Sequence, residues 1–502
     1  MGPTEIALSP SAGVSLLAAA QLLPLAAAGI VLALHRSRWL WLLGVALGVV
    51  ELALVLAVYR AFDAGLPQMQ LVESLALGPL RYHAAVDGLS IAFMLLTAIV
   101  TLLVLLYGVV LRQQPYARFL AAVFGLEATV MGMFTTLNLL WFVALSAVEL
   151  ALIAYLLGQW STSPERELAI RRYQQFMGIG LLLLVTGALL LGWNHADATG
   201  AWSFDLTDLL KVEEPQAIRS LLFFLLFYGL ALRVPLFPLH GWLPITAEHG
   251  TVAVAPVFLL GLKIGIYGLL RFVFPLLPDA VLFWHKFVVG FAVAGIFYAA
   301  ILALLQTNLR RLLAYAVVSH TSVLVIGLFS LSHTAFQSAV MLSVDFGIAI
   351  AGLFLMTGLV LRRTNTMVLA RLGGLWDRIP VIGAAFLVAA LSIVGMPGTP
   401  GFDAAHLMLE AAIERFGGLV TIAAALGNVA AAAFLLLAFQ RAFLAPPTGR
   451  AATAPVATAT AAEWVLAGLV IAILLGTGFW SEPWMALTAG ALEPLAAHFP
   501  HP

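Results

Sequence analysis

The sequence lacks cysteine altogether and is poor in charge: none of its 502 residues is cysteine, and 10% are Asp, Glu, Lys or Arg. Without cysteine the chain can form no disulfide, bind no iron–sulfur cluster through thiolates and use no cysteine nucleophile. It also has no glycine-rich loop of the nucleotide- or dinucleotide-binding type. The net charge is zero and neither end carries a run of one sign, which argues against nucleic acid as a partner. We therefore expect no cofactor in this chain.

Hydrophobic residues make up 63% of the sequence, against about 45–50% in soluble domains. They form continuous runs long enough to cross the roughly 30 Å hydrocarbon core of a bilayer, without the alternation of a membrane β-barrel. The sequence therefore predicts an all-α polytopic membrane protein with about fourteen transmembrane helices. Their approximate centres are Leu23, Val49, Thr101, Val130, Ile153, Leu184, Phe227, Leu262, Ala292, Val323, Gly352, Leu391, Ala431 and Ile471.

Two of these helices are expected to be broken. The eighth contains Gly250 and Pro256, and the twelfth is interrupted by GMPGTPGF, from Gly395 to Phe402. Irregular backbone at membrane depth persists where protein or a water-lined cavity satisfies its polar groups, and paired breaks are typical of transporters built from inverted repeats. We expect helices 1–3 in residues 1–115, a first five-helix repeat in 116–276, an inverted second repeat in 277–445, and a linker with helix 14 in 446–502.

The distribution of basic residues predicts the topology. Arginine-rich connections fall on one side of the expected membrane, whereas the acidic stretch from Asn194 to Arg219, expected as a surface loop or short helix, falls on the other. Because basic loops stay on the cytoplasmic side, both termini are expected on the outer side. The basic residues are His35, Arg36, Arg38, Arg112, Arg118, Arg166, Arg171, Arg172, Arg310, Arg311, Arg362, Arg363, Arg371, Arg378, Arg441 and Arg450.

Ionisable residues inside the apolar runs are the candidate functional groups. Glu149 and Lys263 lie in expected helices, where a charge near the bilayer centre costs about 2.5 kcal/mol or more. Arg233 is a candidate partner of Glu149, either as a movable electrostatic gate or as a fixed salt bridge between helices. Lys263 can serve as a proton station, because an apolar site favours release of its proton; the alternative is a lysine that extends to the membrane surface.

Further ionisable residues could extend such a path. His320 and Asp345 lie within the tenth and eleventh expected helices, and His320 could equally be a satisfied core residue. Glu248 and His249, at the first break, are candidates for an entrance. Asp403, His406 and Glu410 follow the second break within about two helical turns. The same spacing would suit either a metal site or the residues of an ion path, and we predict an ion path without a metal.

The motifs resemble the antiporter-like membrane subunits of respiratory complex I and the Mrp-type cation/proton antiporters, with the subunit M branch the most similar. The similar segments are VDGLSIAFMLLTAIVTLLVLLYG, NLLWFVALSAVELALIAYLL, LALRVPLFPLHGWLP, LLGLKIGIYGLLRF, QTNLRRLLAYAVVSHTSVLVIGL and VGMPGTPGF, between about Asp87 and Phe443. The resemblance implies a fourteen-helix core with inverted five-helix repeats around a hydrated charged axis. It places the gating carboxylate at Glu149, the central lysine at Lys263 and the linking histidine at His320.

Three positions depart from the family pattern. Arg233 stands where the family has a gating lysine, Phe346 where it has a histidine, and Ala405 near its terminal charged residue of the twelfth helix. Phe346 lies next to Asp345, which is itself unusual for the family, and Asp403, His406 or Glu410 are candidate substitutes for the charge near Ala405. Because arginine keeps the charge without exchanging protons, these changes indicate either a divergent paralogue in a related complex or a subunit whose conduction has been rerouted or lost.

The sequence and the resemblance together predict a proton-translocating subunit of a complex I-type NADH:quinone oxidoreductase or a related energy-converting complex, with no redox centre of its own. The alternatives are an ion-coupled transport module without electron transfer (a cation/proton antiporter or a proton-driven inorganic-carbon uptake subunit) and a non-conducting scaffold paralogue. Expected partners are other membrane subunits, the lipid bilayer, and protons or Na⁺. The expected location is a bacterial-type inner membrane.

Overall fold

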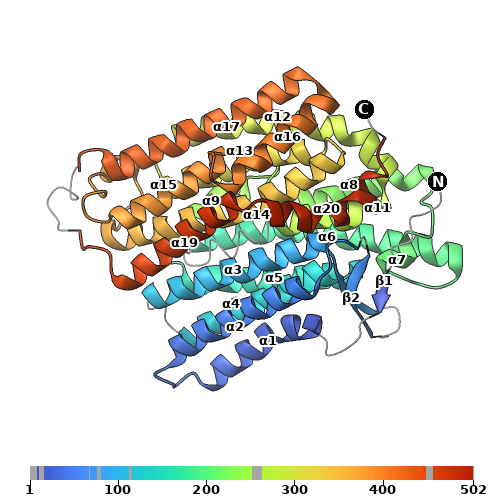
Figure 1. Ribbon diagram of the computed structural model, residues 1–502, viewed down its shortest axis with the longest axis horizontal. Helices are drawn as coiled ribbons and strands as arrows, with labels where there is room; N and C mark the ends of the chain where they lie inside the picture. Colours follow the sequence, from blue (N-terminus) through green and yellow to red (C-terminus); the bar gives the residue numbers. More distant parts are fainter. Residues whose placement is uncertain are drawn as a thin grey trace.

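Long helices lying side by side make up most of the chain, as seen in a computed structural model (Figure 1). The structure describes residues 8–10, 16–66, 68–75, 81–111, 116–250, 263–447 and 456–500. The helices of the first half are α1 (Leu16–Ala33), α2 (Leu40–Ala61), α3 (Gly88–Leu111), α4 (Tyr116–Thr135), α5 (Leu139–Trp160), α6 (Arg166–Thr199), α7 (Leu206–Leu209), α8 (Gln216–Ala231) and α9 (Trp242–His249).

The second half continues the bundle after the gap in the described residues. Helical turns from residue 263 lead into the π-helix η1 (Leu269–Val273). The elements that follow are α11 (Phe274–Leu276), α12 (Pro278–Leu305), α13 (Leu309–Leu328), α14 (His333–Thr364), the 3₁₀ turn η2 (Leu369–Arg371), α15 (Pro380–Val394), α16 (Pro400–Phe416), α17 (Gly418–Phe439), the π-helix η3 (Gln440–Leu444), α19 (Ala461–Phe479) and α20 (Glu482–Ala496).

The polytopic all-α prediction is confirmed. Eleven helices among the described residues are long and apolar enough to cross a membrane, and α8 and α15 are shorter apolar helices. Thirteen of the fourteen expected centres fall inside helices, and the remaining one, Leu262, lies outside the described residues. The total of fourteen spans and the inverted repeats stay predictions.

The break in the twelfth span is present where it was expected. Gly395 ends α15 in the left-handed conformation, with φ of 80°, which a residue with a side chain rarely adopts. Pro400 then begins α16. Of the other expected break, Gly250 caps the end of α9, whereas Pro256 lies outside the described residues.

A small sheet at one end of the bundle was not predicted. Strand β1 (Leu8–Pro10) pairs in parallel with β2 (Met69–Leu75), which pairs antiparallel with β3 (Tyr82–Val86). The acidic stretch lies near this sheet, with α7 as its short helix, because Asn138 at the start of α5 bridges to Asp205 at the start of α7. The sheet therefore belongs to the membrane-external cap of this end.

The centre of the bundle is formed by α3, α13 and α14, whose residues are almost all buried. Helix α14 packs against α3, α13, α15, α16, α19 and α20, so side chains on every face of it are enclosed by protein. In ordinary membrane helices one face meets lipid, and polar residues on a fully enclosed helix escape that contact. This arrangement allows α14 to carry polar groups at membrane depth.

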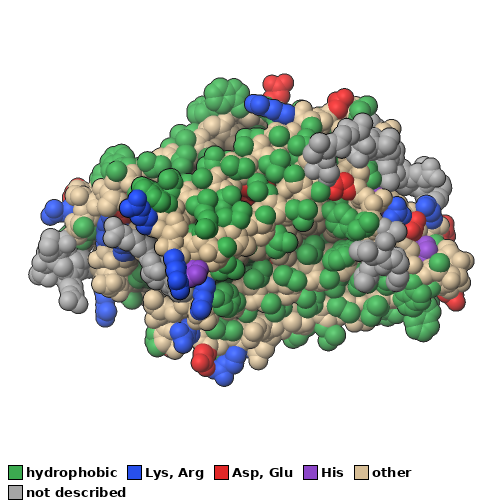
Figure 2. All heavy atoms as spheres, turned by 90° about the horizontal axis from the view of Figure 1, so that it is seen from below, with side chains coloured by type: hydrophobic (Ala, Val, Ile, Leu, Met, Phe, Trp, Pro, Cys, Tyr) green, Lys and Arg blue, Asp and Glu red, His purple; other side chains and the backbone are tan. Residues whose placement is uncertain are grey.

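The two ends of the bundle differ in charge. The described chain ends, β1 and the end of α20, lie at the same end of the molecule, opposite the α1–α2 connection (Figure 1). In the face shown in Figure 2, Lys and Arg gather at the end opposite the termini, and apolar side chains cover the middle. This agrees with the predicted pattern of basic loops, of which Arg112 and Arg450 lie outside the described residues.

Candidate functional site

Glu149 and Arg233 form a buried ion pair between α5 and the turn that follows α8. The side chains are 2% and 4% exposed, so neither charge reaches water. Arg233 also lies 3.4 Å from the carbonyl oxygen of Ser146, one helical turn before Glu149. A charge buried in this way is tolerated because its partner compensates it.

Lys263, Phe346 and His320 come together from three segments of the chain. The Lys263 Nζ lies 4.4 Å from the centre of the Phe346 ring, a cation–π distance. The centre of the His320 ring lies 4.7 Å from the centre of the same ring. Phe346 therefore contacts both Lys263 and His320.

His320 makes no hydrogen bond with either ring nitrogen among the described residues, although the side chain is 3% exposed. A buried polar group without a partner costs free energy, so such a group indicates a ligand, a water or a functional role. Both interpretations of His320, as a core residue and as part of a proton path, stay predictions.

Asp345 lies next to Phe346 on α14 and is 1% exposed. Its Oδ1 accepts a hydrogen bond of 2.5 Å from the Ser392 hydroxyl on α15, whereas Oδ2 has no partner among the described residues. The charges of Asp345 and Lys263 are close enough to interact, although the two groups form no ion pair within 4 Å in the described structure. Asp345 thus joins the buried charged residues, and Ser392, which sequence reasoning missed, positions it.

The entrance candidates lie in a polar cluster at the end of α9. The His249 Nε2 is 3.3 Å from a carboxylate oxygen of Glu165 and 3.8 Å from one of Glu248. Glu248 in turn pairs with Arg311 at 3.3 Å and accepts a hydrogen bond from Asn308. These residues come from the basic connections before α6 and α13, so the cluster lies at the basic end of the bundle.

Asp403, His406 and Glu410 are not brought into the interior. Asp403 is half-buried, and His406 and Glu410 are exposed on the outer face of α16, whereas Ala405 is buried. No group of three or more His, Asp or Glu side chains that could hold a metal occurs among the described residues. The outward direction follows from the helical spacing, because the buried face of α16 is used for packing against α14.

Two further buried carboxylates lie on neighbouring helices, α2 and α4. Glu127 on α4 and Glu51 on α2 are 2% and 1% exposed. The Thr101 hydroxyl lies beside the Glu127 carboxylate, and neither oxygen of Glu51 accepts a hydrogen bond within the described structure. The charges of Glu127 and Glu51 are close enough to interact. The signal for Glu51 was a lone carboxylate in the apolar run GVALGVVELALVLAV.

At the end that carries the termini, two carboxylates outside the membrane-spanning helices have shifted acidities. Burial would raise the pKa of Asp205, but hydrogen bonds from His83 and Thr207 outweigh it and lower the pKa below its ordinary value. The His83 Nδ1 lies 2.6 Å from the Asp205 Oδ2. Burial raises the pKa of Glu214 to about 7, against smaller opposite effects of Asn194 and Arg219.

Residues 136–430 match the family model described as the transmembrane segment of NADH:quinone oxidoreductase and the Mrp antiporter. The chain is 30% identical over 422 residues to NADH-quinone oxidoreductase subunit M of Pseudomonas aeruginosa, with 82% of this chain and 81% of the relative covered. It is 28% identical over 448 residues to the subunit M of Escherichia coli K12, with 87% of each covered.

Solved structures show the same fold. A chain of respiratory complex I from Thermus thermophilus superposes with a TM-score of 0.85 at 27% identity, covering 96% of this chain and 98% of the other. A chain of the Mrp complex from Dietzia sp. superposes with a TM-score of 0.83 at 20% identity, covering 97% and 99%. The second likeness concerns the fold alone.

Proposed function

Because the chain belongs to the NADH:quinone oxidoreductase/Mrp antiporter transmembrane family, we propose that it is a proton-translocating, antiporter-like membrane subunit of a complex I-type oxidoreductase. Electron transfer then takes place in partner subunits, and this chain moves protons through the membrane. The observation that carries the proposal is the set of ionisable side chains buried in the bundle at Glu149, Arg233, Lys263, His320 and Asp345.

The order of these groups suggests a route. Protons enter near His249 and Glu248 at the basic end, where several polar side chains meet. Lys263, His320 and Asp345 then carry them through the middle of the bundle, since each of these groups can gain and lose a proton. The Glu149–Arg233 pair acts as the gate: opening the pair exposes an uncompensated carboxylate, which changes the electrostatic potential at Lys263.

The surroundings of the chain follow from the same proposal. The relatives are subunits of NADH-quinone oxidoreductases, and we place this chain likewise among other membrane subunits in a bacterial inner membrane. His406 and Glu410 on the outer face of α16 support such a partner, because ionisable groups facing lipid are costly and a neighbouring subunit would cover them. Both termini lie on the outer side in this proposal, since the basic end faces the cytoplasm.

A second candidate, a non-conducting scaffold in the position of a pump, is favoured by one observation. The Phe346 ring contacts both Lys263 and His320 and can neither donate nor accept a proton. If no water passes this ring, the route is interrupted. The chain would then support assembly of the complex without translocating protons itself.

The test is proton uptake by inverted membrane vesicles that contain the complete complex, with NADH as the electron donor. Lys263→Ala removes the central proton-exchanging group. We expect the vesicles to lose most of the proton uptake that this subunit contributes, while the complex remains assembled. Lys286→Ala is the matched control, because Lys286 is an exposed lysine on α12. Uptake by Lys263→Ala equal to that of the control would reject translocation through this chain in favour of the scaffold.

A further inference from the structure

Helix α2 brings one carboxylate into the interior, although most of its surface faces outward. Its buried residues form a single stripe, which consists of Leu40, Gly44, Gly48, Glu51, Val55 and Val58. Glu51 is the ionisable member of this stripe and lies near the middle of the 22-residue helix. The spacing of three or four residues places it on the face that packs against α3 and α4. The carboxylate is therefore enclosed at membrane depth.

A close contact between α2 and α4 brings Glu51 and Glu127 to the same level. A Cβ atom at Gly44 of α2 would lie 2.8 Å from the Leu120 side chain of α4. Both helices run toward the small sheet, because α2 leads to β2 and α4 ends beside β3. Glu51 follows Gly44 by seven residues, and Glu127 follows Leu120 by seven residues. Since each residue advances a helix by about 1.5 Å, the two carboxylates lie equally far from this contact.

Thr101 of α3 reaches the same level from the opposite direction. A Cβ atom at Gly48 of α2 would lie 2.6 Å from the Leu105 side chain of α3, which runs away from the sheet. Glu51 is three residues beyond Gly48, and Thr101 is four residues before Leu105. Both are thus about one helical turn from this contact, on the side of the sheet. The Thr101 hydroxyl lies beside the Glu127 carboxylate, so polar side chains of three helices converge.

The helices packed against this site provide no cation at its level in the described structure. The basic residues of α1 to α5 are Arg60 and Arg118, and both are exposed. Each is nine positions from the glutamate on its own helix, which is about 13 Å along the axis. The other titratable residues of these helices and of β3 are Tyr59, Tyr82, His83, Tyr107, Tyr116, Glu149 and Tyr155.

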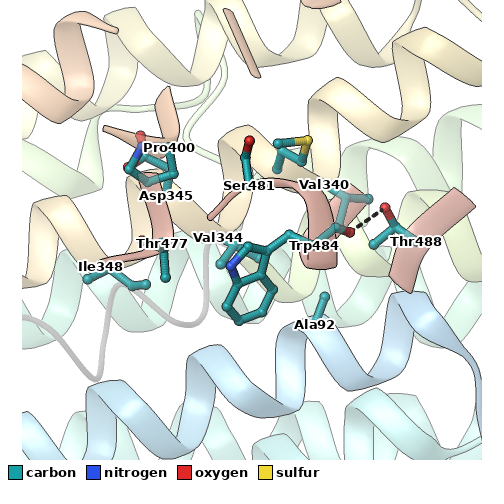
Figure 3. A pocket seen from close by; sticks show the side chains of 11 residues that line it. Ala92, Val340, Val344, Asp345, Ile348, Pro400, Thr477, Ser481, Trp484 and Thr488 are labelled. Atoms are coloured by element: carbon teal, nitrogen blue, oxygen red, sulfur yellow. Dashed lines mark hydrogen bonds between the residues drawn. The ribbon is translucent and has the colours of Figure 1, made fainter. Parts of the chain in front are cut away.

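Other buried carboxylates in the bundle have a donor. Glu149 pairs with Arg233. Asp345 accepts a hydrogen bond from Ser392, and it lines a small cavity whose other walls are mostly apolar (Figure 3). Both oxygens of Glu51, in contrast, have no partner among the described residues. An ionised carboxylate in these surroundings is unfavourable, and a second negative charge nearby makes it more so.

Protons relieve this cost more completely than a metal cation. A Na⁺ ion between two carboxylates would leave a net negative charge inside the membrane, whereas one proton on each carboxyl group leaves none. A protonated carboxyl group can also donate a hydrogen bond, and a hydroxyl group such as that of Thr101 can accept one. Loss of a proton from Glu51 would place a negative charge close to Glu127, which opposes loss of the second proton.

We propose that Glu51 and Glu127, together with Thr101, form a proton-binding site at membrane depth in which both carboxyl groups are protonated at neutral pH. The site lies on α2, α3 and α4, apart from the route through Lys263 and His320, and does not depend on it. Release of either proton to water leaves a charge that these three helices do not compensate. The packing of the first helices therefore becomes sensitive to pH.

Infrared spectroscopy of the complete complex at neutral pH tests the protonation state. A protonated carboxyl group has a carbonyl stretching band that an ionised carboxylate lacks. We expect this band to lose intensity in Glu51→Gln and in Glu127→Gln, and to lose the sum of both amounts in the double variant. Glu167→Gln is the matched control, because Glu167 is exposed on α6 and its removal is expected to leave the band unchanged. Spectra of the two variants equal to that of the control would overturn the site.

A second measurement distinguishes protons from Na⁺. Glutamine keeps the shape of a protonated glutamic acid, so Glu51→Gln/Glu127→Gln is expected to assemble. Its dissociation temperature on a native gel is expected to be the same in NaCl as in choline chloride, and so is that of the natural chain. A rise with Na⁺ in the natural chain alone would overturn the proposal in favour of a Na⁺ site. Failure of the double variant to assemble would show that the negative charges are needed and would also overturn it.

The pH dependence of stability gives a third readout. If the folded protein holds these protons more tightly than the unfolded chain, its stability falls as the pH rises. Between pH 7 and pH 9 the dissociation temperature of the natural chain is therefore expected to fall by several degrees more than that of Glu51→Gln/Glu127→Gln. Equal decreases for the two proteins would overturn the proposal, because the variant has no proton to release at these positions.

Discussion

Phe346 determines what the buried charged residues can do at the level of single side chains. Its ring stabilises a positive charge on Lys263 but cannot accept a proton from the ammonium group. The same ring contacts His320, whose ring nitrogens have no hydrogen-bond partner in the described structure. Under the proposed function, a proton that moves between Lys263 and His320 must therefore travel through water beside the ring. The aromatic residue thus contacts the Lys263 ammonium and, having no acidic proton, offers no direct transfer of its proton to His320.

Phe346→Leu is expected to destabilise the complex by about 2 kcal/mol more than truncation of a comparable ring, because a desolvated cation–π contact is lost with the packing. Phe354→Leu is the control, since Phe354 is an equally buried ring on α14 with no cation contact in the described structure. The measurement is the temperature at which half of the complex dissociates on a native gel. Equal shifts for the two variants would mean that Lys263 is neutral in the folded protein.

The Glu149–Arg233 pair gives a prediction about compensation. Arg233→Gln leaves a buried carboxylate without its cation and is expected to destabilise the subunit by about 3–5 kcal/mol. The double variant Glu149→Gln/Arg233→Gln removes both charges and is expected to recover most of that loss. Dissociation temperatures of the single and double variants measure the difference. Additive losses would show that the two side chains are stabilised independently.

At the scale of elements, the membrane-external end of the bundle contains the helices and strands that sequence patterns identified least well. Asp205 begins α7, and its hydrogen bonds to His83 and Thr207 connect that helix to β3. Because the pKa of Asp205 is lowered, this contribution to stability is complete above its ordinary value and disappears as the pH falls through the lowered one. The connection is therefore intact at neutral pH.

Glu214, beside α7, predicts the opposite pH dependence. Burial raises its pKa from 4.5 to about 7, so its contribution to stability is complete below 4.5 and is lost as the pH rises through 7. Trypsin is therefore expected to cleave after the exposed Lys211 faster in the natural chain than in Glu214→Gln at pH 8, and by a smaller ratio at pH 6. Comparing the two proteins at each pH cancels the pH dependence of trypsin itself. Equal rates of cleavage of the natural chain and of Glu214→Gln at pH 8 would mean that Glu214 is in contact with water.

The outcome for the helices shows which signals a sequence carries. Runs of apolar residues located thirteen helices among the described residues, eleven of them long enough to cross a membrane, because the bilayer sets the length of a span. The glycine- and proline-rich GMPGTPGF located a break. The break between α19 and α20 was missed because TGFWSEPW is nearly as apolar as its surroundings, and only its contact with Gly398 in space distinguishes it. Likewise, β2 and β3 pair outside the membrane, where hydropathy gives no signal.

The candidate site was predicted in part for the same reason. Rare charges in apolar runs identified Glu149, Lys263 and Asp345 directly, since the membrane excludes them unless they are enclosed. The scarcity of charged residues does not show which face of a helix each of them occupies. For this reason Asp403, His406 and Glu410 were grouped with residues that face inward. The contact between Lys263 and Phe346 joins segments more than eighty positions apart, which no local pattern encodes.

At the scale of the whole molecule, the two ends of the bundle predict the orientation in the membrane. The described chain ends lie opposite the basic connections (Figure 1, Figure 2). We expect alkaline phosphatase fused after the C-terminus to be active and green fluorescent protein at the same place to be dark, because the phosphatase is active only outside the cytoplasm. Fusions to the connection between α1 and α2 are expected to give the reverse result. Phosphatase activity at both sites would contradict the predicted topology.

The enclosure of α14 by six other helices has a mechanical consequence for the complex. A close-packed helix that touches α3, α13, α15, α16, α19 and α20 cannot shift alone, so rearrangement at any one of these contacts reaches the others. In the complex proposed above, a change that a redox partner causes at the edge of this subunit would reach its middle through these helix contacts. In the same proposal, the close packing around α14 would also limit proton leakage through the subunit when the complex is not turning over.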